Sequence, residues 1–136
     1  MNKRLKNIGI WALKLIAAFI MLQTLYFKFS GAPESVYIFK TIGLEPAGRI
    51  GTGILELVAS ILILIPAATV FGALLGVGLM SGAIFFHLTK LGLNVMDDGG
   101  QLFIYAVLVL LCSLALVFLN RTKIFDFIRL HHRYRF

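Results

Sequence analysis

Four long apolar segments constrain the fold of this chain more than any other feature. They cover residues 8–27, 50–65, 69–88 and 101–119. Each is close to the ~20 residues that an α-helix needs to cross the hydrocarbon of a bilayer. Because the backbone must satisfy its own hydrogen bonds in lipid, the segments are expected to be helical. We therefore predict an all-α integral membrane protein, built as an antiparallel four-helix bundle.

Few charges interrupt the chain. Of its 136 residues, 60% are hydrophobic and 14% are charged. A soluble domain rarely has this composition, because it needs polar surface to cover its core. Lys3, Arg4 and Lys6 precede the first segment, as in a cleaved signal peptide, but the segment exceeds the about 7–15 residues of a signal core. An uncleaved first helix is therefore expected. The single cysteine, Cys112, excludes an internal disulfide and a two-cysteine redox relay.

The basic residues predict the orientation of the four spans. With four spans both termini lie on one side, and that side carries twice as many Lys and Arg residues as the other. The positive-inside rule then places both termini in the cytoplasm, and we expect the membrane to be a bacterial plasma (inner) membrane. Lys14, within the first segment, is expected to extend its ammonium to the cytoplasmic headgroups. The terminal side carries Lys3, Arg4, Lys6, Arg121, Lys123, Arg129, Arg133 and Arg135, and the other side carries Lys28, Lys40, Arg49 and Lys90.

The last residues, RTKIFDFIRLHHRYRF at 121–136, form a basic and partly amphipathic tail. Such a segment is expected to lie against anionic lipid headgroups. We therefore divide the chain into a membrane domain at 1–120 and a cytoplasmic tail at 121–136. The net charge of +7 comes without a nucleic-acid recognition motif, so membrane lipids are the expected partners and nucleic acid is not. No residues have the spacing of a metal site, and none is predicted.

Glu56 stands within the apolar stretch GILELVASILILIPA at 53–67, where an unpaired carboxylate would be costly to bury. The topology brings it level with polar residues of the other three segments, in the outer third of the bilayer. Intramembrane ionisable groups are candidates for function, although they can also simply hold helices together. We predict that Lys28 or His87 is the partner of Glu56. The expected polar pocket comprises Lys28, Glu56, His87, Gln101 and Tyr105.

The third segment contains two G-x-x-x-G pairs. Gly72 and Gly76 form one pair, and Gly78 and Gly82 form the other. Small residues at this spacing let helices approach closely in lipid. We predict that all four glycines lie at helix contacts.

The sequence leaves open whether the loop at 30–46 is extended or helical. Within it, Val36, Phe39 and Ile42 are spaced three apart. This spacing suits a short helix lying on the outer membrane surface with its apolar side down.

Four motifs in order along the chain resemble the DoxX-like family of small four-helix membrane proteins. They are YFKFSGAP at 26–33, GILELVASILILIP at 53–66, GALLGVGLMSGAIFFHL at 72–88 and DDGG at 97–100. The resemblance extends over residues 8–120 and leaves out the basic tail. The positions that match the family pattern are Lys28, Glu56 and His87.

The resemblance implies two functions of different classes. The family takes its name from a subunit associated with thiosulfate:quinone oxidoreduction. This chain would then be a subunit of a membrane redox system that takes a quinone or lipid-like ligand between its helices. Glu56 and His87 would exchange protons with the ligand, and Lys28 would balance the charge. Other relatives resemble assembly factors, so the alternative is a non-enzymatic scaffold. Partner subunits or a homo-oligomer are compatible with both, and whether the chain is an enzyme stays open.

Overall fold

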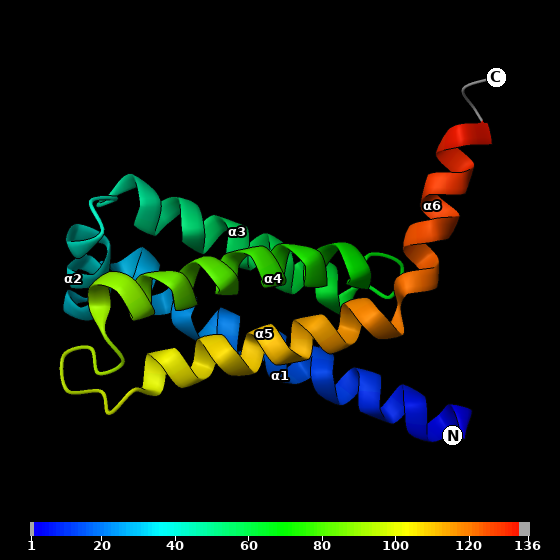
Figure 1. The fold of residues 1–136 in the computed structure, drawn as a ribbon, viewed down its shortest axis with the longest axis horizontal. Helices are drawn as coiled ribbons and strands as arrows, with labels where there is room; N and C mark the ends of the chain where they lie inside the picture. Colours follow the sequence, from blue (N-terminus) through cyan, green and yellow to red (C-terminus); the bar gives the residue numbers. More distant parts are fainter. Residues whose placement is uncertain (1, 134–136) are drawn as a thin grey trace.

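The computed structural model describes residues 2–133, except for the side chain of residue 131. Within this part of the chain there are six α-helices, one π-helical turn and no strand. The predicted all-α fold is confirmed (Figure 1). The elements are α1 (Lys3–Ser30), α2 (Pro33–Thr41), α3 (Ala47–Leu64), α4 (Thr69–Phe86), η1 (His87–Leu91), α5 (Gln101–Leu119) and α6 (Arg121–Arg133).

Four helices are long and apolar enough to cross a membrane: α1, α3, α5, and α4 continued by η1. They run antiparallel along one axis (Figure 1). We call the end that carries α2 the α2 end, and the opposite end, which carries α6 and the start of α1, the α6 end. The 28 residues of α1 measure about 42 Å at 1.5 Å per residue, against about 30 Å of hydrocarbon. Its first turns accordingly reach beyond the bundle at the α6 end.

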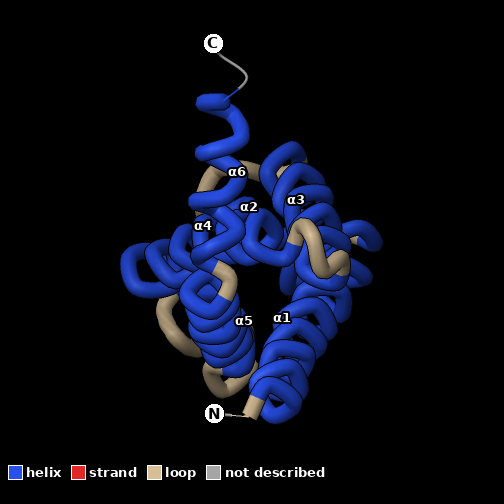
Figure 2. Tube along the Cα trace, turned by 90° about the vertical axis from the view of Figure 1, so that its right-hand side faces the viewer, coloured by secondary structure: helices blue, strands red, loops and turns tan. Residues whose placement is uncertain are grey.

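Each spanning helix packs against two others, in the cyclic order α1, α3, α4, α5. Figure 2 shows this arrangement around a common axis. Met21, Ile63, Val109 and Leu116 are almost completely buried between the helices. The outer surface of the bundle is also apolar, and Phe19 is 69% exposed there. Such side chains are stable in contact with lipid, so the bundle is an integral membrane protein.

One proline and one hydroxyl delimit the hairpin between α3 and α4. Pro66 has no backbone N–H to donate to α3, which ends at Leu64. The Thr69 hydroxyl donates to the carbonyls of Ile63 and Ile65, at 2.9 and 3.0 Å, and so satisfies acceptors that the end of α3 leaves free. These contacts hold a tight turn at the α6 end.

The glycines of α4 fall into two groups. A Cβ on Gly72 would lie 2.6 Å from the Ile63 nitrogen, and one on Gly76 would lie 2.7 Å from Ser113 Oγ, so both glycines lie at close helix contacts. The prediction for Gly78 and Gly82 needs correction, because a Cβ at either position would meet nothing within 4 Å. The second G-x-x-x-G pair is rotated away from the neighbouring helix and faces a cavity instead.

The 30–46 segment contains a helix, α2, which begins with Pro33 at a position where a missing N–H costs nothing. The spacing predicted that the apolar side of this helix lies on the membrane surface. That side instead faces the inside of the bundle. Phe39 is buried, and Ile38, Phe39 and Ile42 face the cavity between the spanning helices. The helix therefore covers the bundle at this end.

Residues 121–133 of the basic tail form α6, which leaves the bundle at a steep angle to its axis (Figure 1). Two contacts dock the start of α6 on the α3–α4 hairpin. Lys123 Nζ donates to the Pro66 carbonyl at 2.8 Å, and the rings of Phe71 and Phe127 meet edge to face at 5.4 Å. The tail is thus attached to the bundle by both a polar and an aromatic contact.

Candidate functional site

A cavity of about 640 Å³ lies at the α2 end, lined by residues of all four spanning helices and of α2. Its volume is typical of pockets that hold small molecules. All five residues of the predicted polar pocket line it. They are Lys28, Glu56, His87, Gln101 and Tyr105.

Glu56, in the middle of α3, is 4% exposed. Its Oε2 atom accepts hydrogen bonds from Lys28 Nζ at 3.0 Å and from Thr24 Oγ1 at 3.1 Å. Both donors lie on α1, one turn apart. An ammonium and a hydroxyl replace the water that a buried carboxylate loses, so these two contacts offset the cost of burying Glu56. Of the two partners predicted for Glu56, Lys28 is therefore the one that pairs with it.

A second ion pair holds Lys28 in place. The Arg49 guanidinium donates to the backbone carbonyl of Lys28, and its Nε lies 2.9 and 3.0 Å from the two carboxylate oxygens of Glu45. A cation at the last turn of a helix is favourable because free carbonyls collect there. The contact joins the end of α1 to the start of α3. This ion pair was not predicted from the sequence, although an acid four residues before an arginine is a recognisable signal.

His87 opens the π-helical turn η1 and is buried. Its Nδ1 atom lies 3.0 Å from the carbonyl of Gly92, and a carbonyl can only accept, so Nδ1 carries a proton. Nε2 makes no hydrogen bond with any described residue. The Phe103 ring meets the imidazole edge to face at 5.7 Å. One ring nitrogen is thus fixed, and the other is available to a ligand in the cavity.

Asp98 lies in the loop before α5 and also lines the cavity. Its Oδ1 accepts from the backbone N–H groups of Val95 and Gly100, at 3.0 and 2.8 Å, and its Oδ2 accepts from Leu102 at 3.1 Å. Burial alone would raise the pKa of this carboxyl. The three backbone donors, helped by His87, outweigh burial and lower the pKa below its ordinary value. Asp98 therefore places a stable negative charge near His87.

Gln101 and Tyr105 occupy the first turns of α5. The side-chain amide of Gln101 donates to the Tyr105 hydroxyl at 2.7 Å. The phenolic proton of Tyr105 and the second amide proton of Gln101 remain free to donate elsewhere. This pair gives the cavity uncharged donors on the side formed by α5.

The rest of the lining is largely apolar. It includes the aromatic rings of Phe27, Phe39 and Phe86 and the side chains of Met21 and Met80. Among residues 2–133, no three His, Cys, Asp or Glu side chains group closely enough to hold a metal ion. The arrangement suits an organic molecule that has an apolar body and a few polar atoms.

Comparison with known proteins agrees with this architecture. The sequence profile of the DoxX-like family matches residues 12–117, which include most of α1 and the rest of the spanning bundle and leave out α6. No curated protein and no solved structure matches the chain. The matched region takes in Lys28, Glu56, His87, Gln101 and Tyr105. With most of its length covered by the family profile, the chain belongs to the DoxX-like family.

Proposed function

We propose that the protein is a quinone-binding subunit of a membrane redox system, and that the cavity at the α2 end is its binding site. The observation that carries this proposal is the lining of the cavity. A buried Glu56–Lys28 pair, His87 and the Gln101–Tyr105 pair stand in otherwise apolar walls. A quinone has matching chemistry, because its two carbonyl oxygens accept hydrogen bonds and its ring and tail are apolar.

The size and chemistry of the cavity fit this ligand class. About 640 Å³ accommodates a substituted ring and part of a tail. Phe27, Phe39 and Phe86 offer aromatic surfaces against which a ring can pack. Lys28 has three N–H donors and uses one on Glu56, so it keeps donors for a ligand carbonyl.

Interconversion of a quinone and its quinol takes up or releases two protons together with two electrons. His87 would exchange one proton through Nε2, since Nδ1 is held by the Gly92 carbonyl. The Asp98 carboxylate would stabilise the imidazolium that forms. Glu56 would exchange the second proton while Lys28 balances its charge. The electrons would pass to or from a partner subunit.

The same proposal includes the membrane in which the protein lies and its orientation there. The excess of basic residues at the α6 end supports a bacterial inner membrane with both termini in the cytoplasm. The cavity would then open toward the outer side. A redox partner would dock at that side, where it can reach the α2 end.

Ligand binding by the purified protein tests this proposal. A short-chain ubiquinone analogue at roughly 100 times its Kd should add about 2.7 kcal/mol of stability and so raise the melting temperature of the bundle in detergent. His87→Leu should weaken binding by about tenfold or more, because it removes a hydrogen bond to the ligand.

Thr89→Ala provides the matched control. Thr89 lies in the same π-helical turn, is exposed, and bonds only to the Phe85 carbonyl of its own helix, at 2.7 Å. This variant should bind the analogue as the wild type does. An unchanged melting temperature with the analogue, or equal affinity in His87→Leu, contradicts the proposal. Either result would favour the non-enzymatic scaffold instead.

A further inference from the structure

One face of α2 is turned into the cavity, and Ser35 is the buried polar residue of that face. It is 7% exposed and lines the cavity. The face consists of residues three or four positions apart, and its other members are Ile38, Phe39 and Ile42. Glu34 lies at its exposed edge. A single hydroxyl therefore enters the cavity from the apolar side of α2.

The Ser35 hydroxyl has no partner in its own helix. A serine or threonine within a helix can donate to the carbonyl four residues earlier. Two other hydroxyls of this chain do so, Thr41 to Tyr37 at 2.7 Å and Ser60 to Glu56 at 2.8 Å. Ser35 is the third residue of α2, so no residue of the helix lies four positions before it. Its hydroxyl makes no hydrogen bond with any described residue.

This unpaired hydroxyl is open to the cavity. Among the described residues, Ser113 Oγ is the one polar side-chain atom that is sealed from solvent and has no hydrogen-bond partner. Ser35 Oγ also lacks a partner but is not sealed, so the accessible part of this buried side chain faces the cavity that it lines. Burying a hydroxyl without a partner is costly, and a ligand atom that accepts its hydrogen bond would remove that cost.

The backbone at the start of α2 also favours an acceptor atom. Val36 is the first residue of the helix whose N–H bonds back, to the Ala32 carbonyl at 3.0 Å, and no side chain caps the helix. The N–H groups of Glu34 and Ser35 thus have no acceptor among the described residues. They leave partial positive charge next to the Ser35 hydroxyl.

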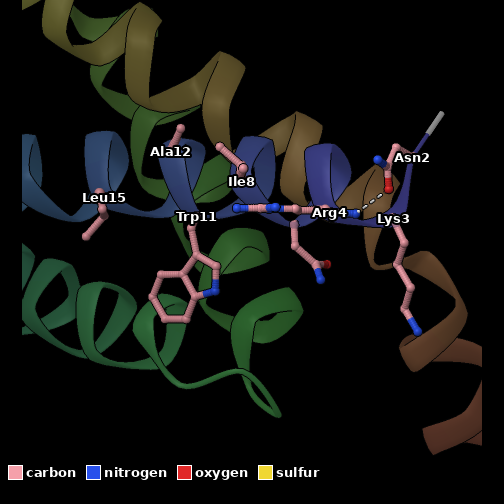
Figure 3. Close-up of a pocket in the computed structure, with 8 residues that line it drawn as sticks. Asn2, Lys3, Arg4, Ile8, Trp11, Ala12 and Leu15 are labelled. Atoms are coloured by element: carbon pink, nitrogen blue, oxygen red, sulfur yellow. Dashed lines mark hydrogen bonds between the residues drawn. The ribbon is translucent and has the colours of Figure 1, made fainter.

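Helix α2 packs against α1, α3 and η1, the elements that carry Lys28, Glu56 and His87. These three residues line the same cavity as Ser35. Enclosure by several elements distinguishes this cavity from the hollow along the first turns of α1, which only that helix and its N-cap line (Figure 3). A ligand in the cavity is therefore covered on the α2 side, with Ser35 among the groups that it meets.

We propose that Ser35 is a ligand-binding residue of this cavity and donates a hydrogen bond to a carbonyl oxygen of the quinone, while the apolar face of α2 covers the ring. The inference rests on the proposed function, because the quinone supplies the acceptor. A serine hydroxyl donates a hydrogen bond without giving up its proton. Ser35 would thus orient the ligand and leave proton exchange to His87 and Glu56.

Binding of a short-chain ubiquinone analogue to the purified protein tests the inference. Ser35→Ala removes the hydroxyl and little volume, so the melting temperature without ligand should stay close to that of the wild type. Its Kd for the analogue should rise about fivefold. Ser81→Ala is the matched control, because Ser81 is exposed on α4 and does not line the cavity. This variant should bind the analogue as the wild type does.

The infrared spectrum of the bound analogue provides a readout of the hydrogen bond itself. A carbonyl that accepts a hydrogen bond absorbs at a lower frequency than a free one. One C=O band should therefore move to higher frequency in Ser35→Ala and stay in place in Ser81→Ala.

A cysteine at position 35 tests the same contact if Ser35→Ala does not fold. With buried Cys112 replaced by serine, Ser35→Cys should react with a small methanethiosulfonate reagent, and the analogue should slow the reaction. Lys40→Cys, at an exposed position of the same helix that does not line the cavity, should react at the same rate with and without the analogue.

The outcomes separate this inference from the proposed function. A wild type that binds the analogue, together with equal Kd values for Ser35→Ala and Ser81→Ala, would overturn the role of Ser35 and leave the proposed function intact. A lack of protection at Ser35→Cys would have the same meaning. A wild type that does not bind the analogue would contradict the proposed function, and the role of Ser35 would fall with it.

Discussion

The ammonium of Lys28 lies 3.0 Å from Oε2 of Glu56, and this contact ties the last turn of α1 to the middle of α3. The side chains are 15% and 5% exposed, so water screens the pair only weakly. Each charge depends on the other for its solvation within the bundle. The contact therefore contributes to the stability of the bundle as well as to the wall of the cavity.

The first prediction concerns this pair. Glu56→Gln should destabilise the bundle by about 3 kcal/mol, because it leaves the Lys28 ammonium without its counter-charge. Adding Lys28→Met should restore part of the loss, whereas His87→Asn should add to it, since His87 bonds to Gly92 and not to Glu56. Chemical denaturation in detergent measures these energies. Strict additivity of Glu56→Gln with Lys28→Met would show that the two side chains are not coupled.

The second prediction concerns the contact of α4 with α5. Gly76→Leu should lower the melting temperature markedly. A Cβ at this position would lie only 2.7 Å from Ser113 Oγ, so the leucine side chain would push α5 away. Gly78→Leu, two residues along the same helix, is the control and should not cause a comparable loss, since a Cβ there meets nothing within 4 Å. An equal drop in melting temperature in the two variants would contradict the account, because it would mean that Gly76 and Gly78 are packed equally closely.

The third prediction concerns Asp98 and pH. Its pKa is lowered on folding, so its contribution to stability is fully present above the ordinary value of 3.8 and is lost as pH falls below it. Asp98→Ala should cost about 1–2 kcal/mol at neutral pH, because three backbone N–H groups lose their acceptor. The melting temperature of Asp98→Ala should also fall less than that of the wild type between pH 5 and pH 3. Asp97→Asn, at the neighbouring exposed position, should change neither, because asparagine also tolerates the φ of 59° at that position.

The fourth prediction concerns topology. With buried Cys112 replaced by serine, Lys40→Cys and Asp97→Cys should react with a membrane-impermeant maleimide added outside intact cells. Lys6→Cys should react only after permeabilisation. The reverse pattern would place the α2 end in the cytoplasm and invert the orientation.

Periodicity, length and hydropathy were sufficient to predict the fold, because a helix in lipid must satisfy its own hydrogen bonds. They also placed Glu56 at the same depth as Lys28 and His87, on the inner faces of their helices, but they did not choose between these two partners. Gly78 and Gly82 show the limit of this reasoning. A G-x-x-x-G pair permits a close contact, but the rotation of α4 depends on the packing of all its neighbours.

Two sets of contacts at the site, those of His87 and of Asp98, could not be predicted from the sequence because they depend on loop geometry. His87 bonds to Gly92 because η1 ends at a glycine with φ of 78°, which no helical periodicity reveals. Asp98 accepts hydrogen bonds from three backbone groups in a turn whose shape the composition does not specify. Both contacts arise in irregular backbone, where spacing along the sequence does not fix spacing in the structure.

Photoaffinity mapping tests the central claim, that the cavity at the α2 end binds a quinone. An azido-quinone should label residues that line the cavity, such as Phe39, Met80 and Tyr105, and excess unlabelled quinone should suppress the labelling. Mass spectrometry of the cleaved protein locates the label. Labelling confined to lipid-facing positions such as Phe19 and Leu111, unaffected by competitor, would contradict the claim.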